Sequence, residues 1–140
     1  MSLILQLLAG HLVARYEITN SFMLDESFLE GVYPDRTYTL GGKIKIKRTC
    51  VLGRHHENHY EEDLVFQCED IEEEQCLLEK ELFSKPWTII DKNDTKKVVV
   101  ERPRWYGINQ KSIIGSLPFI LQNKDIIVLA GKIKLRVVSC

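Results

Sequence analysis

The stretch CVLGRHHENHYEEDLVFQC, residues 50–68, holds the densest group of side chains that could bind a metal. Its candidate zinc ligands are Cys50, His55, His59 and Cys68, with His56 beside them. Thiolate and imidazole groups are the ligands that structural zinc prefers, and a hairpin would bring the two ends of the segment together. The spacing matches no common zinc finger and contains no closely spaced pair of cysteines. We therefore predict a solvated histidine-rich loop, with no resident metal or other cofactor.

Carboxylates in the same stretch also allow an acid–base pair to be drawn, for example Glu61 with His59. The rest of the sequence does not support a catalytic site around such a pair. It contains no GxSxG nucleophile motif and no glycine-rich loop that would hold a phosphate. Because almost any charged loop contains an acid near a histidine, we predict that this protein is not an enzyme.

A second distinctive segment is ERPRWYG, residues 101–107, which combines arginine with two aromatic residues in a predicted connection between strands. Tryptophan, tyrosine and arginine supply much of the binding energy at protein interfaces. The predicted partner-binding residues are Arg102, Arg104, Trp105 and Tyr106. Two alternatives remain open here: the aromatic rings also suit stacking on nucleic-acid bases, and Trp105 could instead plug one end of the domain.

Two phrases of the sequence are nearly identical, LGGKIKIKRTC at residues 40–50 and LAGKIKLRVVSC at residues 129–140. Lysines and aliphatic residues alternate in both, which is the pattern of a half-buried β-strand. We predict that the aliphatic side chains are buried, namely Ile44, Ile46, Ile133 and Leu135. We predict that the lysines are exposed, namely Lys43, Lys45, Lys132 and Lys134, because a shift of one residue would put them in the core.

The lysine faces of these strands also suggest an alternative function, the binding of single-stranded nucleic acid. A small β-barrel would bind a single strand with exposed aromatic residues and lysines on its open face. The candidate residues for this function are Tyr38, Lys43, Lys45 and Lys47. Lysines on the solvent side of a strand also occur for solubility alone, so the pattern by itself does not require a ligand.

Composition narrows the classes of protein that remain. The chain has 140 residues, of which 44% are hydrophobic and 28% are charged, values typical of a folded domain rather than a disordered chain. The formal net charge of −1 argues against binding long duplex DNA through bulk charge. Acidic residues concentrate between residues 57 and 81 and cations elsewhere, so we expect an acidic side and a basic side.

Cysteine usage and the N-terminus bear on localisation. The four cysteines form no CxxC pair and no signal peptide is evident, which favours reduced thiols and an intracellular protein, cytoplasmic or nuclear. The apolar stretch at residues 2–13 meets a charge at Arg15, too soon for a transmembrane segment. Apolar residues recur in this stretch at helical spacing, so we predict a helix packed on the domain, although residues 13 and 16–18 also suit a strand.

Short alternating runs separated by turn signals make up most of the remaining chain. We predict one hairpin from residues 37–52 and 60–68, a second from 87–90 and 97–101, and a long closing strand at 126–138. The acidic segment 69–83 suits a short helix or a solvated loop. The prediction is a single mainly β domain of residues 1–140. It would be a small OB-like barrel or β-sandwich of about five to eight strands, with one or two short helices. Residues 1–36 would form a helix or strand and a loop, and 37–140 the barrel core.

The segments PWTIIDKNDTKKVVV and IIVLAGKIKL carry a resemblance to known proteins. Together with the strand beginning at Gly41 they resemble the five-stranded OB barrel. More narrowly, Pro86, Trp87, Asp91 and the valines 98–100, with Val128 and Gly131 later, resemble the GIDE-type domain of membrane-anchored ubiquitin ligases. The chain shows neither transmembrane spans nor a RING-type cysteine and histidine array. What the resemblance implies is a binding or regulatory module without catalytic residues.

These observations favour a non-enzymatic protein-interaction module on an OB-like β-barrel, belonging to a larger complex or protein. The partner is expected to be a protein, bound through the segment around Trp105 and an adjacent strand edge. The alternative is a single-stranded nucleic-acid-binding protein that uses the lysine faces.

Overall fold

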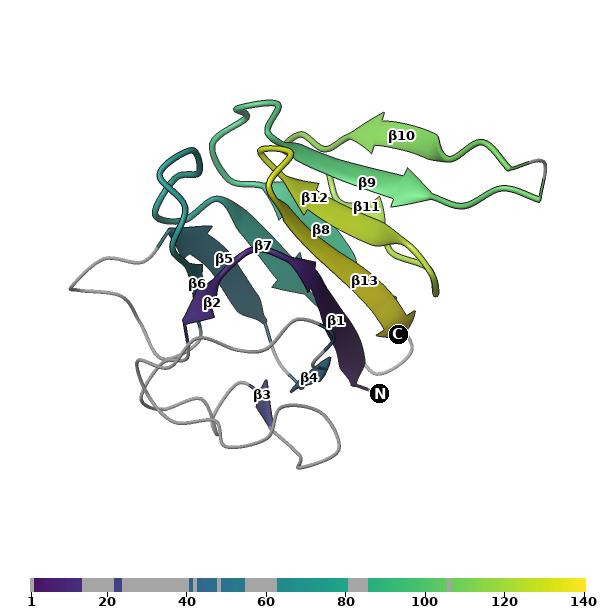
Figure 1. The fold of residues 1–140 in the computed structure, drawn as a ribbon, viewed down its shortest axis with the longest axis horizontal. Coiled ribbons are helices and arrows are strands. Elements are labelled where there is room, and N and C mark those ends of the chain that lie inside the picture. Colours follow the sequence, from purple (N-terminus) through teal and green to yellow (C-terminus); the bar gives the residue numbers. More distant parts are fainter. Residues whose placement is uncertain are drawn as a thin grey trace.

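The structure is a computed structural model and describes residues 2–13, 22–23, 41, 43–47, 49–54, 63–80, 86–105 and 107–140. Within these residues the chain forms β-strands in two sheets and no helix (Figure 1). The mainly β class is confirmed, whereas the predicted short helices are not found in this part of the chain. The described part likewise has no helix with the length and hydrophobicity needed to cross a membrane. Most of the loop predicted within residues 1–36 lies outside it.

One sheet has seven strands. They are β1 (Leu3–Ala9), β3 (Phe22–Met23), β4 (Lys43–Ile46), β9 (Val98–Arg102), β10 (Gln110–Ile113), β12 (Ile126–Leu129) and β13 (Ile133–Ser139). Their order across the sheet is β10–β9–β12–β13–β1–β4–β3, with every pair antiparallel. The strand at one side of this sheet is therefore β10.

The other sheet has six strands. They are β2 (Leu12–Val13), β5 (Cys50–Arg54), β6 (Asp63–Phe66), β7 (Cys76–Glu79), β8 (Thr88–Asp91) and β11 (Phe119–Ile120). Their order is β11–β8–β7–β5–β6–β2. Neither strand order returns to its first strand, so among the described residues neither sheet closes on itself.

A single apolar core draws side chains from both sheets. Members of this core are Leu5, Leu7, Leu135 and Val137 from the seven-stranded sheet and Leu52, Leu64, Leu78 and Ile89 from the other. The largest buried side chain is Trp87, which is 1% exposed and directly precedes β8. Burying these side chains removes apolar surface from water, the main favourable contribution to folding.

The N-terminal stretch forms a strand, so the predicted helix is wrong. Leu3, Leu5 and Leu7 are buried at every second position of β1, while the residues between them are half-buried. The sequence contains apolar residues at both helical and strand spacing, which is why periodicity alone misled the prediction. Backbone pairing with β13 on one side and β4 on the other decides in favour of the strand.

The two repeated phrases contribute the two strands that flank β1. Their aliphatic residues Ile44, Ile46, Ile133 and Leu135 are all buried, as predicted. On the opposite face, Lys132 and Lys134 are exposed as predicted, but Lys43 and Lys45 are half-buried. β4 lies between β1 and β3, so its lysines have a strand on each side, whereas Lys132 lies in the turn before β13.

The predicted first hairpin does not form. The segment 37–52 was expected to be one strand, but β4 and β5 belong to different sheets. β5 pairs with β6 in parallel, not as the two arms of a hairpin, and its antiparallel partner is β7. The described part of the acidic segment begins as a loop with turns, one of the two predicted alternatives, and continues as β7 instead of a helix.

The second predicted hairpin is also wrong. β8 and β9 follow each other in the chain, but they lie in different sheets and do not pair. In the sequence, two alternating runs separated by turn residues look the same whether or not the two strands pair. The turn between them can also lead the chain from one sheet to the other. The antiparallel partners of β9 are β10 and β12.

The closing segment 126–138 is a hairpin of two strands and not one long strand. Leu129 in β12 pairs with Ile133 in β13, and the Lys132 amide donates to the Leu129 carbonyl at 3.0 Å. Ala130 and Gly131 both have positive φ angles, 52° and 68°. Positive φ at both central residues is the geometry of a tight hairpin turn.

Candidate functional site

The strands β9 and β10 form a hairpin that projects from the body of the protein (Figure 1). We call the connection at its end, residues 103–109, the tip. β9 lies between β10 and β12, so one arm of the hairpin is anchored in the sheet while the other arm lies at its side. This hairpin carries the predicted partner-binding residues.

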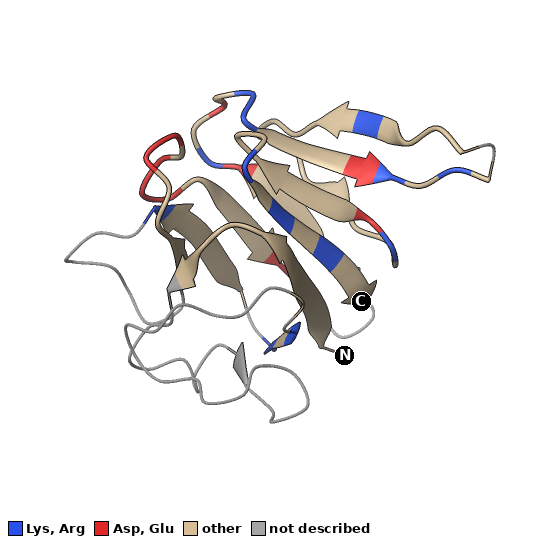
Figure 2. Ribbon diagram, in the orientation of Figure 1, with Lys and Arg blue, Asp and Glu red and all other residues tan. Residues whose placement is uncertain are grey.

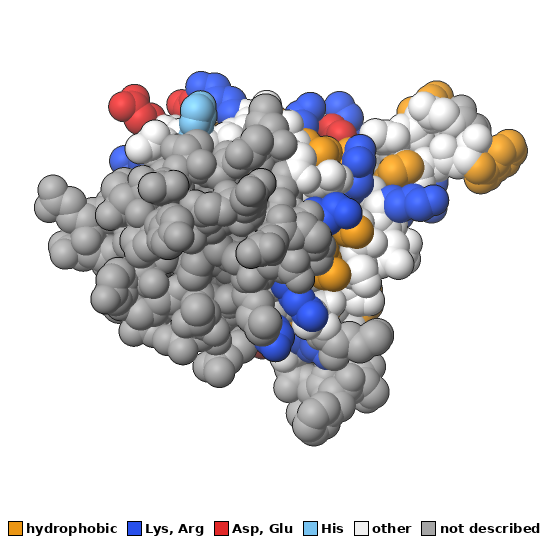
Figure 3. All heavy atoms as spheres, turned by 60° about the horizontal axis from the view of Figure 1, so that its bottom comes forward, with side chains coloured by type: hydrophobic (Ala, Val, Ile, Leu, Met, Phe, Trp, Pro, Cys, Tyr) orange, Lys and Arg blue, Asp and Glu red, His pale blue; other side chains and the backbone are white. Residues whose placement is uncertain are grey.

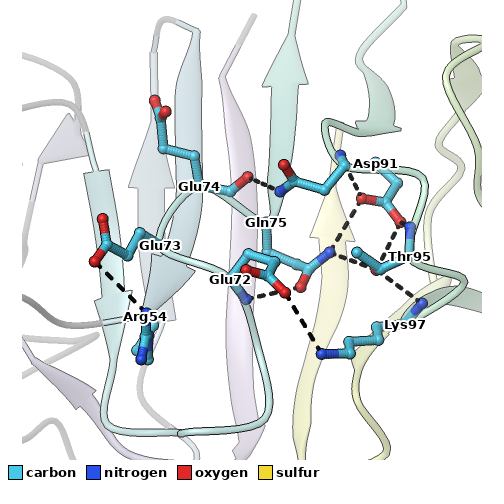
Figure 4. Close-up of polar contacts among 9 residues, drawn as sticks. Arg54, Glu72, Glu73, Glu74, Gln75, Asp91, Thr95 and Lys97 are labelled. Atoms are coloured by element: carbon cyan, nitrogen blue, oxygen red, sulfur yellow. Dashed lines mark hydrogen bonds and ion pairs between the residues drawn. The ribbon is translucent and has the colours of Figure 1, made fainter.

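A buried polar network fixes the chain immediately before β9 (Figure 4). The fully buried Gln75 donates from Nε2 to Asp91 Oδ1 at 3.0 Å and to Thr95 Oγ1 at 2.8 Å. Asp91 Oδ2 in turn accepts bonds from the Thr95 amide at 2.8 Å and from the Thr95 hydroxyl at 3.0 Å. Thr95 Oγ1 accepts from the Lys97 amide, one residue before the strand begins. These bonds set the direction in which β9 leaves the turn.

Acidic side chains of the loop at residues 69–74 reinforce this region. Ion pairs join Glu72 to Lys97 at 3.7 Å, Glu73 to Arg54 at 3.5 Å and Glu74 to Lys92 at 3.3 Å. Figure 2 shows the acidic loop next to basic residues of the neighbouring turns. The acidic cluster is therefore largely neutralised by nearby cations, and the expected acidic side is less pronounced than the sequence implied.

A second polar contact fixes the other end of β9. Arg102 donates from Nε to Asp125 Oδ1 at 2.8 Å and from Nη2 to Asp125 Oδ2 at 2.9 Å. Arg102 Nη2 also donates to the Ile120 carbonyl at 3.0 Å, and its guanidinium lies 5.2 Å from the centre of the Phe119 ring. The hydrogen bonds to Asp125 raise the pKa of Arg102 above its usual value. This arrangement, which we call the Arg102 clamp, holds the end of β9 that leads into the tip.

The Arg102 clamp changes how the predicted site is understood. Asp125 is completely buried, and its Oδ2 also accepts a bond from the Gln122 amide at 2.8 Å. A buried carboxylate needs such partners, because an unpaired charge away from water is costly. Arg102 was predicted to contact a partner, which stays a prediction, and the structure shows that it also holds the end of β9 through Asp125. Its companion Asp125 was not among the residues identified from the sequence.

The tip presents its aromatic residue to solvent. Trp105 is 95% exposed, so it does not plug the domain, and the buried tryptophan is Trp87. The Gly107 amide donates to the Arg104 carbonyl at 3.0 Å, which closes a turn around Trp105, and Gly107 has a φ of 85° that favours glycine. Arg104 is exposed and donates from Nη2 to Gln110 Oε1. Tyr106, the fourth predicted residue, lies outside the described residues.

Other apolar side chains are exposed around the same hairpin. Besides Trp105, the exposed apolar residues of this region are Ile108, Ile113, Leu117 and Ile120, with 54% to 80% of their surface accessible. Figure 3 shows hydrophobic side chains at the projecting tip. Single exposed apolar residues are normal, but Trp105, Ile108 and Ile113 lie on the same projecting hairpin, and such a group is typical of an interaction site.

The residues predicted for nucleic-acid binding fall elsewhere. Lys43 and Lys45 lie on β4 and Lys47 follows that strand, while Tyr38 lies outside the described residues. The structure adds cations that the prediction did not include, since Lys134 and Arg136 occupy the same face of the sheet on β13. Gln6 of β1 pairs with both Lys43 and Arg136 in the register, and Arg136 Nη1 donates to Gln6 Oε1 at 3.5 Å.

The residues considered as metal ligands do not come together. Because β5 and β6 are parallel, Cys50 lies at the start of this pair and Cys68 beyond its far end. Cys50 and Arg54, which pairs with Phe66, are about 13 Å apart at the usual rise per residue of a strand, and Cys68 follows Phe66 at that far end. His55 and His59 lie outside the described residues, and within the described part no group of three or more potential ligands gathers. All four cysteines are free thiols.

A cavity of about 440 Å³ lies between the turns at Gly10 and Lys132, with Cys68 and Asp70 among its lining residues. Lys132 and Asp70 form an ion pair there, and their hydrogen bond, together with the attraction between the two charges, lowers the pKa of Asp70 and raises that of Lys132. Because its two principal charges are paired with each other, this cavity indicates no particular ligand. The hairpin remains the stronger candidate site.

Comparison with known proteins adds no family to this description. No protein-family model matches the chain, and no curated protein matches it.

Proposed function

We propose that this protein is a non-enzymatic interaction module that binds a partner protein through the tip of the β9–β10 hairpin. The observation that carries the proposal is the 95% exposure of Trp105 at the end of a projecting hairpin. Leaving a tryptophan in water contributes little to folding, whereas a buried tryptophan is a frequent hot spot of protein interfaces. The sequence resemblance to the GIDE-type domain, which implies a binding module, agrees with this proposal.

The way the hairpin is held also supports a binding role. The Gln75–Asp91–Thr95 network fixes the beginning of β9 and the Arg102 clamp fixes its end. An interaction element that is held in one orientation loses less conformational entropy when a partner binds. The tip is therefore presented by a strand that both polar contacts hold in place.

Site-specific photo-crosslinking in cells tests this function. A photoreactive phenylalanine analogue replaces Ile108 at the tip, and in a matched control it replaces Asn93, which is also exposed but lies outside the hairpin. We expect a discrete crosslinked protein from position 108 and not from position 93, and we expect Trp105→Ala to abolish that product. Equal crosslinking at both positions, or crosslinking unaffected by Trp105→Ala, would contradict the proposal.

A second function, binding of single-stranded nucleic acid, is favoured by one specific observation. β4 and β13 flank β1, so the cations of both repeated phrases lie on one face of one sheet, which we call the basic face. It comprises Lys43, Lys45, Lys134 and Arg136, and none of these four pairs with an acid among the residues that the structure describes. Phosphates would release counterions from such a surface on binding.

Titration of a labelled oligothymidine against the protein at increasing salt tests this second function. Binding through the basic face should weaken steeply with salt, and Lys134→Glu should reduce both the affinity and the salt dependence. Lys92→Glu is the matched control, because Lys92 already pairs with Glu74 outside this face. Failure to bind at low salt, or equal effects of both variants, would exclude the basic face as a nucleic-acid site.

A further inference from the structure

The strand β10 forms one side of the seven-stranded sheet, and it is the exposed arm of the projecting hairpin. Gln110, Lys111 and Ile113 are exposed, and Ile113 keeps 67% of its surface accessible. Figure 1 shows β10 at the outer border of the sheet, with β9 on its inner side. A strand in this position presents unpaired backbone groups to its surroundings.

The hydrogen-bond register identifies which backbone groups face outward. The Ile114 amide donates to the Val98 carbonyl at 2.8 Å, so residue 114 faces β9. Backbone groups alternate in direction along an antiparallel strand, so Ser112 and Gln110 also face β9. Lys111 and Ile113 therefore direct their N–H and C=O groups away from the sheet.

The other side of β9 confirms this alternation. The Ala130 amide donates to the Lys97 carbonyl at 2.8 Å, which places residue 97 toward β12. Residues 99 and 101 then face β12 as well, and they are the residues opposite Ile113 and Lys111 in the register. Both sides of β9 thus give the same assignment of the outward-facing groups.

We propose that an extended, acidic segment of the partner protein adds a strand to β10, pairing with the backbone of Lys111 and Ile113. This inference rests on the proposed function and specifies how the partner is bound. Strand addition is a general mode of peptide recognition in which backbone bonds supply affinity and alternate side chains supply specificity. The side chains of Ile113 and Lys111 share one face, so they favour an apolar residue and an acid in the added strand.

Charge decides between a foreign segment and a second copy of this chain. The hairpin from residue 98 to 113 carries three cations and one acid, and with Arg102 neutralised by Asp125 its net charge is +1. Arg104 and Lys111 lie toward its tip, and both are exposed. Pairing β10 with β10 of a second copy would bring two positive hairpins together, whereas an acidic segment would be attracted. The occupant is therefore an acidic strand from a different protein.

A synthetic peptide in which Glu and Val alternate serves as the probe, and a peptide in which Lys and Val alternate is the charge-reversed control. Amide hydrogen exchange of the full chain is followed by NMR with and without each peptide. In the free protein we expect the Lys111 and Ile113 amides to exchange rapidly, and the Ser112 amide slowly. The acidic peptide should bind with a dissociation constant below about 1 mM and should protect the amides of Lys111 and Ile113.

Lys111→Pro and Lys111→Gln provide a matched pair of variants. Proline removes the outward N–H without removing a bond to β9, so the hairpin should persist, since edge strands accept proline at such positions. Glutamine removes the charge but keeps the N–H. We expect Lys111→Pro to weaken peptide binding at least about tenfold and Lys111→Gln to weaken it less. Unchanged chemical shifts of the core amides would show that both variants are folded.

Three outcomes would overturn strand addition. The first is that the acidic peptide does not bind, and the second is that it binds without protecting the amides of Lys111 and Ile113. The third is that these amides are already protected in the free protein because it self-associates, which would make a second copy the occupant. The proposed function is separable from this result. If Trp105→Ala abolishes crosslinking at position 108 while β10 stays unprotected, the tip is the interface and strand addition is wrong.

Discussion

Arg102 and Asp125 lie 23 residues apart in the chain and form a two-point ion pair, with Nε–Oδ1 and Nη2–Oδ2 distances of 2.8 and 2.9 Å. Asp125 precedes β12 and Arg102 ends β9, so the pair joins two neighbouring strands directly before the tip. The side chain of Asp125 is fully buried and that of Arg102 is 18% exposed. The pair therefore fixes the point at which the chain leaves β9 and the tip begins.

Removing Arg102 should destabilise the protein. Arg102→Ala leaves the buried Asp125 carboxylate with only the Gln122 amide, so we expect a loss of about 2–3 kcal/mol in the free energy of unfolding. This expected loss is at or below the lower end of the range for breaking a fully buried ion pair, because the Arg102 side chain is partly exposed to solvent. Urea denaturation measures the loss. Lys111→Ala, which removes an exposed pair with Glu101, is the control and should cost less than about 1 kcal/mol. Equal losses would contradict the clamp.

The two tryptophans should respond in opposite ways to truncation. Trp105→Ala should change the free energy of unfolding by less than about 0.5 kcal/mol, because the side chain is almost fully exposed. Trp87→Ala should cost about 3–5 kcal/mol, the range for a large buried aromatic residue. Urea melts of both variants measure this difference. A large loss of stability in Trp105→Ala would mean that this residue supports the fold and is not reserved for binding.

Gly53 should tolerate no side chain. A Cβ atom at this position would lie 1.8 Å from the Glu73 carbonyl oxygen, so the backbone of β5 or of the acidic loop has to move. We expect Gly53→Ala to cost about 1–3 kcal/mol, as overpacking does elsewhere. Gly115→Ala is the matched control, since a Cβ there would meet only Asp94 Oδ1 at 3.6 Å. Thermal or urea unfolding compares the two, and the prediction fails if they are equally stable.

Stability should fall at alkaline pH because of Cys76. Burial, with smaller contributions from Cys50 and Asp91, raises the pKa of this thiol well above 9.0. The folded state therefore keeps Cys76 protonated while the unfolded state ionises, so stability is full below pH 9 and declines as the pH rises above it. We expect a smaller decline in Cys76→Val, measured by urea melts at pH 8 and 10. Parallel declines in both proteins would assign the effect to other groups.

The sequence by itself determined the local properties of this protein. In Lys43-Ile44-Lys45-Ile46 the alternation decides which side chains face the core, because successive residues of any strand point to opposite faces. The same rule fixed the faces of the closing strand around Leu135. The mainly β class followed from the number of alternating segments in the chain, and it did not depend on which strands pair with each other. The predicted interface at Trp105 began in the same way, from residue types that suit binding.

Only the tertiary structure decided how these strands are combined. β5 and β6 could have paired in either direction, and β8 and β9 could have formed a hairpin, because turn residues do not specify which sheet the next strand joins. The exposure of Trp105 depended on whether its connection folds over the core or projects from it. That outcome is set by contacts distant in sequence, above all Arg102 with Asp125. Such contacts leave no periodic signal, since each depends on the position of two strands that the local sequence does not specify.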